Sequence, residues 1–227
     1  MAKKFRKKRS MGLLSSVERF YIFCEGKATE DNYFKGFKKE IKRNPIYKNA
    51  VHIEVILGCN ETIKVVEEAE KFVKNNHIQY GRIWCVFDKD DFTSFDEAID
   101  KVENLNKDKD NNLIFNVAWS NECIEYWFLS HFCYQVANNG RKQYIETLNK
   151  QFNKYRLPEY SKNMINIFDI LLNYGNPKSA TKYCKKRYRD FKKSRKPPSL
   201  FAPCTTIFFL IEELANYLSP PLKEKFI

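Results

Sequence analysis

Three acidic residues crowd a four-residue stretch directly after an apolar run. Residues 82–87 read Arg-Ile-Trp-Cys-Val-Phe, and Asp88, Asp90 and Asp91 follow them. If the chain stays extended there, residues two apart point the same way, so the carboxylates of Asp88 and Asp90 can face one cation. Carboxylate ligands with open water positions suit Mg²⁺ or Mn²⁺. An acidic turn that caps the next helix would give the same pattern.

A second acid has the same kind of position, which favours the metal site. The apolar residues 19–24 run into Glu25 and Gly26. Function gathers beyond the carboxyl ends of parallel strands, so Glu25 and Asp88 are expected at one edge of a sheet. Glu125 is set among aromatic residues and is costly to bury unless it is paired or meets a metal. Glu122, three residues earlier, is expected beside Glu125 on one helix.

The elements that must position these acids alternate along the chain. Apolar runs predict strands, and residues at helical spacing predict helices between them. Thr29 is expected to cap the first helix, and Ser120 or Asn121 to cap a helix directly after the fourth strand. The alternation predicts an α/β fold with a mainly parallel four-stranded sheet flanked by helices. The predicted strands are 19–24, 51–57, 82–87 and 113–119, the helices 30–42, 61–75 and 94–106, and the polar loop 106–112.

The second part of the chain reads as a helical extension. Helices are predicted over 139–153, 161–174, 177–193 and 204–218, the last with Thr205 and Thr206 as caps. We therefore expect three parts in one globular unit: a basic flexible tail at 1–17, an α/β core at 18–136, and an extension at 137–227 packed on that core.

The chain is strongly basic around this acidic cluster. Its formal net charge is +12, which favours a polyanionic partner such as nucleic acid. The tail is either a solubilising segment or an arm that contacts phosphates. A dense basic segment is interleaved with aromatic residues and could contact nucleic acid, with Lys178 and Lys182 near the scissile phosphate, although a solvated helix face explains it as well. Its candidate binding residues are Lys178, Lys182, Lys186 and Arg187.

Cysteine usage and hydropathy indicate a cytoplasmic protein. The seven cysteines are scattered without a CxxC pair, so they are expected to be reduced core residues, and a zinc site is disfavoured. No segment is long and apolar enough to span a membrane, and the amino terminus lacks the apolar core of a signal peptide.

The motifs together resemble the RloB family from about residue 18 onward. The combined spacing is distinctive, whereas each piece alone is not. The family usually has proline where this chain has Glu122, and an aromatic residue where it has Ile124; neither change removes a carboxylate. The matching motifs are Glu25-Gly26, Thr29-Glu30, Tyr33-Phe34, Asp88-Lys89-Asp90-Asp91-Phe92, Ser120-Asn121, Glu125-Tyr126-Trp127, His131-Phe132, and Pro203 with Thr205-Thr206.

The resemblance implies a Toprim-type domain, the metal-binding module shared with topoisomerases, primases and overcoming-lysogenization-defect nucleases. It implies a Mg²⁺-dependent nuclease that is the effector of an antiphage abortive-infection system, encoded beside an ATPase of the ABC/AAA type, in some cases within a type I restriction locus. Carried over by position, Glu25 would act as general acid/base, and Asp88 and Asp90 would hold Mg²⁺. Asp91 and Glu125 would serve a second metal or an outer contact.

Two function classes stay open. In the first, the protein cleaves RNA, tRNA among them, or DNA; in the second, it is a non-catalytic Toprim-like subunit that binds nucleic acid or a phage trigger and docks on the ATPase. A phosphatase of the haloacid dehalogenase type is disfavoured because Phe92 stands where a small residue or Thr is needed. An EF-hand is excluded by a missing Gly and by Ile99 at the position of the bidentate Glu. The oligomeric state is left open, a homodimer included.

Overall fold

The structure is a computed structural model that describes residues 17–26, 28–58, 61–90, 93–107 and 112–227. Three features from the sequence fall wholly or partly outside these residues. They are residues 1–16 of the basic tail, the acid Asp91, and residues 108–111 of the polar loop.

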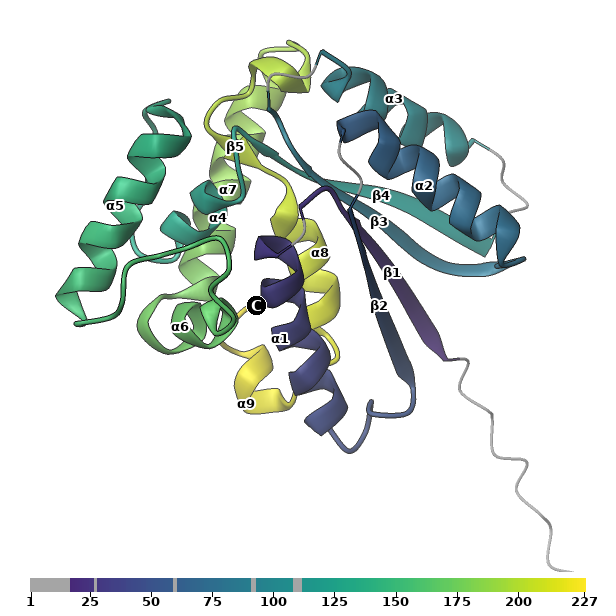
Figure 1. The fold of residues 1–227 in the computed structure, drawn as a ribbon, viewed down its shortest axis with the longest axis horizontal. Coiled ribbons are helices and arrows are strands. Elements are labelled where there is room, and N and C mark those ends of the chain that lie inside the picture. The colour runs from purple at the N-terminus through teal and green to yellow at the C-terminus, as the bar shows by residue number, and fades with distance from the viewer. Residues whose placement is uncertain (1–16, 27, 59–60, 91–92, 108–111) are drawn as a thin grey trace, which may run out of the picture.

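A five-stranded sheet forms the centre of the molecule (Figure 1). The strand order is β2-β1-β3-β4-β5, with the first four strands parallel and β5 antiparallel to β4. The predicted mainly parallel α/β fold is confirmed, but the count of four strands was one short because β5 is only two residues long. The strands are β1 Glu18–Cys24, β2 Val51–Leu57, β3 Tyr80–Asp88, β4 Asn112–Asn121 and β5 Cys204–Thr205.

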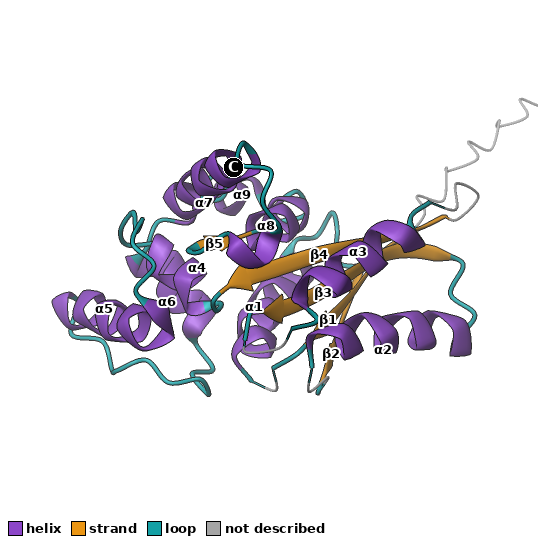
Figure 2. Cartoon of the chain, turned by 90° about the horizontal axis from the view of Figure 1, so that it is seen from above, coloured by secondary structure: helices purple, strands orange, loops and turns teal. Residues whose placement is uncertain are grey.

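Helices cover both faces of the sheet because successive strand residues point to opposite sides. Phe20 and Ile22 pack in a large core with α1 and the helices of the second half, whereas Tyr21 and Phe23 pack with α2 and α3. Figures 1 and 2 show α2 and α3 together on one side of the sheet. The helices are α1 Thr29–Arg43, α2 Thr62–Asn75, α3 Phe95–Leu105, α4 Glu125–Ser130, α5 Gly140–Lys154, α6 Ile167–Tyr174, α7 Pro177–Lys192, α8 Ile207–Ala215 and α9 Pro220–Lys223, with a short 3₁₀ helix at Pro198–Leu200.

The register of the sheet places the predicted acids at one edge. Cys24 of β1 pairs with Val86 of β3, and Asp88 pairs with Ser120 of β4. Glu25 therefore leaves β1 close to the point where β3 ends at Asp88. The prediction that these strand ends share one edge is confirmed.

Several predicted boundaries at the end of β4 were wrong. Ser120 and Asn121 do not cap a helix, because both still belong to β4 and pair with β5. The Ser120 hydroxyl lies 3.0 Å from that of Thr205, and the Trp119 N–H donates to the Thr206 hydroxyl. The next helix begins only at Glu125, so Glu122 is not its helical neighbour.

Other helix starts also differ from the sequence prediction. Thr29 is not an N-cap; it lies inside α1, and its hydroxyl donates to the carbonyl oxygen of Lys162 at 3.0 Å. The predicted helix 161–174 is shortened to α6, and the predicted helix 204–218 divides into β5 and α8. The Thr29 hydroxyl thus bonds to a distant backbone atom, which sequence patterns do not reveal. The Thr205 hydroxyl does both: it accepts from the N–H of Ile207 at the start of α8 at 3.2 Å and donates to the Trp119 carbonyl oxygen at 3.0 Å.

Two expectations about composition can also be checked. The six described cysteines form no disulfide with one another. Within the described ranges, no helix has the length and apolar character needed to cross a membrane.

Candidate active site

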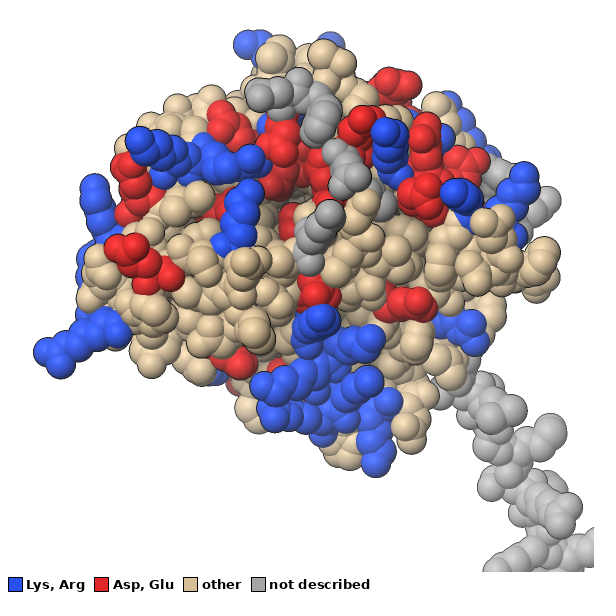
Figure 3. Space-filling view, in the orientation of Figure 1, with Lys and Arg blue, Asp and Glu red and all other residues tan. Residues whose placement is uncertain are grey.

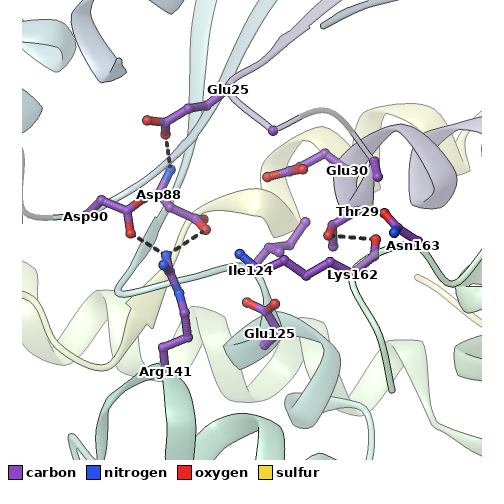
Figure 4. A pocket seen from close by; sticks show the side chains of 12 residues that line it. Glu25, Thr29, Glu30, Asp88, Asp90, Ile124, Glu125, Arg141, Lys162 and Asn163 are labelled. Atoms are coloured by element: carbon purple, nitrogen blue, oxygen red, sulfur yellow. Dashed lines mark hydrogen bonds and ion pairs between the residues drawn. The ribbon is translucent and has the colours of Figure 1, made fainter. Parts of the chain in front are cut away.

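A cavity of about 260 Å³ lies beyond the carboxyl ends of β1 and β3 (Figure 4). It is bounded by the start of α1, the start of α4, the first turn of α5 and the loop before α6. Among the described residues, five carboxylates and two cations line it. The acids are Glu25, Glu30, Asp88, Asp90 and Glu125, and the cations are Arg141 and Lys162.

Glu25 is held against the end of β3 by a backbone contact. Its Oε2 accepts a hydrogen bond from the Asp88 N–H at 3.2 Å. Gly26 then lets α1 start close to the strand end, since a Cβ there would lie 2.2 Å from Oε2 of Glu30. A side chain at position 26 would therefore displace Glu30 from the cavity.

Arg141 brings a positive charge from the helical extension to the strand ends. Its Nη2 lies 3.4 Å from Oδ2 of Asp88 and forms a closer ion pair with Asp90 (Figure 4). The Arg141 backbone N–H donates to Oε2 of Glu122 at 2.9 Å, which fixes the start of α5. Both aspartates face the same cation, as predicted from their spacing, but that cation is a guanidinium.

Glu125 is the most deeply buried acid of the cavity, with 2% of its surface exposed. Its Oε1 accepts a hydrogen bond from the Tyr160 hydroxyl at 2.9 Å. A partner was expected for a buried acid at this position, and the partner of Glu125 is the Tyr160 hydroxyl. Glu30, also buried, faces the same cavity from the first turn of α1.

Burial and crowding make the carboxylates hard to ionise. Removal from water raises the pKa of Glu25 from 4.5 to about 7, against the opposing hydrogen bond from the Asp88 N–H. Burial also raises the pKa of Asp88 well above its ordinary value, and the charges of Glu30 and Glu125 add to this, while Arg141 opposes it. The described acids of the cavity outnumber its described cations, and burial relieves their mutual repulsion by favouring the protonated forms of Glu25 and Asp88.

The donor set fits a hydrated hard cation better than a closed metal cage. Among the described residues, no three Asp, Glu, His or Cys side chains are arranged to hold a metal ion. Mg²⁺ typically keeps several waters and takes one or two carboxylates plus substrate phosphates. Asp88 and Asp90, which face one cation already, match that requirement, with Glu25 beside them.

Some site residues could not be found from the sequence alone. Arg141 is one of 40 basic residues, and nothing beside it in the sequence marks it as a partner of Asp88. Glu30 and Lys162 reach the cavity only because the start of α1 and the loop before α6 meet there. Asp91 lies outside the described residues.

The predicted nucleic-acid contacts on α7 do not line this cavity. Lys178 and Lys182 are exposed, Lys186 lies over the ring of Tyr134, and Arg187 lies over that of Phe191. The cations at the cavity are Arg141 and Lys162 instead. The expectation that Lys178 and Lys182 stabilise a phosphate at the acids is therefore not supported by their position.

Comparison with known proteins identifies a family. The comparisons with curated proteins and with solved structures found no match. The family model described as RloB-like protein matches residues 20–214, a range that holds the strands, the acidic cavity and the helices up to α8. The chain therefore belongs to the RloB-like protein family.

Proposed function

We propose that the protein is a Mg²⁺- or Mn²⁺-dependent nuclease that hydrolyses phosphodiester bonds in RNA or DNA. The observation that carries this proposal is the meeting of Glu25, Asp88 and Asp90 in one cavity of a chain with net charge +12. A basic surface attracts a polyanion, and clustered carboxylates repel one unless a cation lies between them. That combination suits phosphoryl transfer.

Each residue has a role that follows from its place. Asp88 and Asp90 would hold the ion, whose bound charge stabilises the negative charge that builds on the phosphoryl oxygens. Glu25 can take a proton from the attacking water, because its pKa near neutrality suits a group that both accepts and returns protons. Arg141 and Lys162 line the same cavity and can bind the phosphate oxygens as the P–O bond to the leaving oxygen breaks.

The test is cleavage of labelled tRNA, other RNA and DNA with Mg²⁺, with Mn²⁺ or with EDTA. Asp88→Asn and Glu25→Gln should lower cleavage at least about a hundredfold, the scale at which a proton-transfer group contributes. Asp100→Asn, at an exposed acid of α3, is the matched control and should cleave as the wild type does. Full cleavage by Asp88→Asn would reject the site.

Family membership motivates a finer proposal about the biological setting. We propose that this chain adopts a Toprim-like arrangement and is the effector of an antiphage abortive-infection system with an ABC/AAA-type ATPase encoded nearby. Co-expression with that ATPase should give a complex that co-purifies, and cells with both proteins should restrict phage. Protection that persists with Asp88→Asn would separate this role from nuclease activity.

One observation favours the non-catalytic alternative. Arg141 already pairs with both Asp88 and Asp90, so these acids have a cation without any metal. In this alternative the chain binds nucleic acid or a phage trigger and docks on the ATPase. Binding of nucleic acid by the complete complex, without cleavage under any metal condition, would favour it.

A further inference from the structure

The outward face of α1 carries a row of lysines on the same side of the molecule as the acidic cavity. Lys35, Lys38, Lys39 and Lys42 are three or four residues apart, so they neighbour one another on the helix surface. Tyr33, Phe34, Phe37 and Ile41 of the same helix are buried in the core. Figure 3 shows Lys and Arg gathered over the carboxyl-terminal part of α1, with acidic side chains above them towards the strand ends.

A cleft of about 240 Å³ lies at the far end of this helix. The described residues that line it include Lys38, Lys42 and Lys48, together with Asn49 and His52, and no carboxylate is among them. His52 Nε2 lies 3.7 Å from Oε2 of Glu54, which is not among the residues that line the cleft. The cleft therefore offers donors and positive charge without a built-in anion.

Among the described residues, Lys38 and Lys42 of α1 and Lys48, which follows that helix, have no acidic partner, unlike the other basic residues of α1. Lys35 pairs with Asp31, Lys39 with Asp169, and Arg43 with Glu40. Within the part of the chain that the structure describes, no carboxylate lies within ion-pair distance of Lys38, Lys42 or Lys48. Three unpaired ammonium groups around one cleft repel each other, and an anion between them relieves that repulsion.

The distance between the cleft and the acidic cavity suits a ligand long enough to occupy both, such as a polynucleotide. Glu30 lines the cavity and Lys42 lines the cleft, twelve positions apart on one helix. That separation is about 18 Å along α1, or roughly five steps of a duplex at 3.4 Å per step. Val17, directly after the basic stretch 1–16 in the sequence, lines the same cleft.

We propose that Lys38, Lys42 and Lys48, called here the α1 lysine cleft, bind the phosphate backbone of a polynucleotide whose neighbouring segment enters the acidic cavity. This rests on the proposed nuclease function and adds where its substrate is held. The binding is through phosphates, so it is independent of base sequence. It places the nucleic-acid contact on α1, away from the α7 residues that the sequence suggested.

The test measures binding without cleavage. Fluorescein-labelled 30-nucleotide RNA and DNA, single- and double-stranded, are titrated with the full chain in EDTA, and fluorescence anisotropy is followed over a range of salt concentrations. The triple variant Lys38→Gln, Lys42→Gln, Lys48→Gln should lose roughly tenfold to a hundredfold in affinity. The slope of log K against the logarithm of the salt concentration should become less negative by roughly 2 to 3, as the loss of three phosphate contacts requires.

A matched control removes the same charge elsewhere. The triple variant Lys178→Gln, Lys182→Gln, Lys186→Gln lowers the net charge equally, at three exposed positions of α7. It should keep wild-type affinity and salt slope. Equal losses in both triple variants would mean that only net charge matters, and no loss in the α1 variant would place the contact elsewhere; either result overturns the proposal.

Two further measurements separate this proposal from the nuclease proposal and from binding to a lipid surface. Binding is measured in EDTA, where metal-dependent cleavage does not occur, so a failure of the nuclease proposal leaves this binding result standing. Vesicles rich in phosphatidylserine are the other polyanion: stronger binding to vesicles than to nucleic acid, abolished in the α1 variant, would overturn the assignment. Circular dichroism melting should show the same transition for wild type and both triple variants, because the changes lie on the surface.

Discussion

Replacing Glu25 by Gln should make the protein more stable at pH 8 while removing the proposed proton-transfer group. Glu25 is half-buried beside other acids, and its pKa is raised from 4.5 to about 7, mainly by burial. Between these values the folded state binds a proton that the unfolded state releases, so stability falls as pH rises through this window. Gln carries no charge, and its amide oxygen can still accept from the Asp88 N–H.

The gain in stability from Glu25→Gln follows from the rise in the pKa of Glu25. A rise from 4.5 to about 7 corresponds to about 3.4 kcal/mol if solvent does not screen the charge. Glu25 is partly exposed, so solvent screening reduces this to about 1–2 kcal/mol. The gain should be fully present above pH 7 and largely absent at pH 5, where folded Glu25 is protonated.

Urea unfolding at pH 5 and pH 8, in EDTA, measures this difference. The three tryptophans are buried and report unfolding by fluorescence. Asp100→Asn, an exposed acid on α3, should change the free energy of unfolding by less than about 0.5 kcal/mol at either pH. Destabilisation of Glu25→Gln at pH 8, or an equal effect at both pH values, would refute the electrostatic account of the cavity.

Two other substitutions probe how the cavity and its supports are held. Arg141→Ala removes the cation beside Asp88, whose side chain is 16% exposed, and should cost about 1–3 kcal/mol at pH 8. The cost should be smaller at pH 5, because burial raises the pKa of Asp88 and so favours its neutral form as the pH falls. Urea unfolding with Lys142→Ala as control would contradict this if both variants behaved alike. Gly36→Ala places a Cβ 2.1 Å from Cγ of Phe168 across the contact between α1 and α6. It should cost about 1–3 kcal/mol in urea unfolding, despite the better helix propensity of Ala; an unchanged midpoint would show that the two helices separate easily.

The central strands β1 and β3 were predictable because each is an uninterrupted apolar run after its arginine. Residues 20–24 and 83–87 are buried on both faces of a parallel sheet, which leaves the acids after them as the first polar side chains at its edge. Glu25, Asp88 and Asp90 could be placed together from topology alone. Family resemblance gave the same three residues.

Contacts between distant segments were not predictable. Thr205 accepts a hydrogen bond from the first N–H of α8, as the cap prediction expects, but the hydroxyls of Thr205 and Thr206 also bond to Trp119 and Ser120 in β4, which the sequence does not indicate. Arg141 and Glu30 enter the cavity only once α5 and α1 have docked on the sheet. Likewise, the basic segment on α7 has a conspicuous composition, whereas the α1 lysine cleft depends on Lys48 folding back beside Lys38 and Lys42.

The ion pair between Arg141 and the two aspartates joins a helix of one half of the chain to the strand end of the other. If a divalent ion binds these oxygens, as we propose, it competes with the guanidinium and its binding is linked to the docking of α5. By thermodynamic reciprocity, the free energy by which α5 docking weakens ion binding equals that by which the ion weakens α5 docking. A protein that bound α5 would then change the affinity for the ion without contacting a carboxylate.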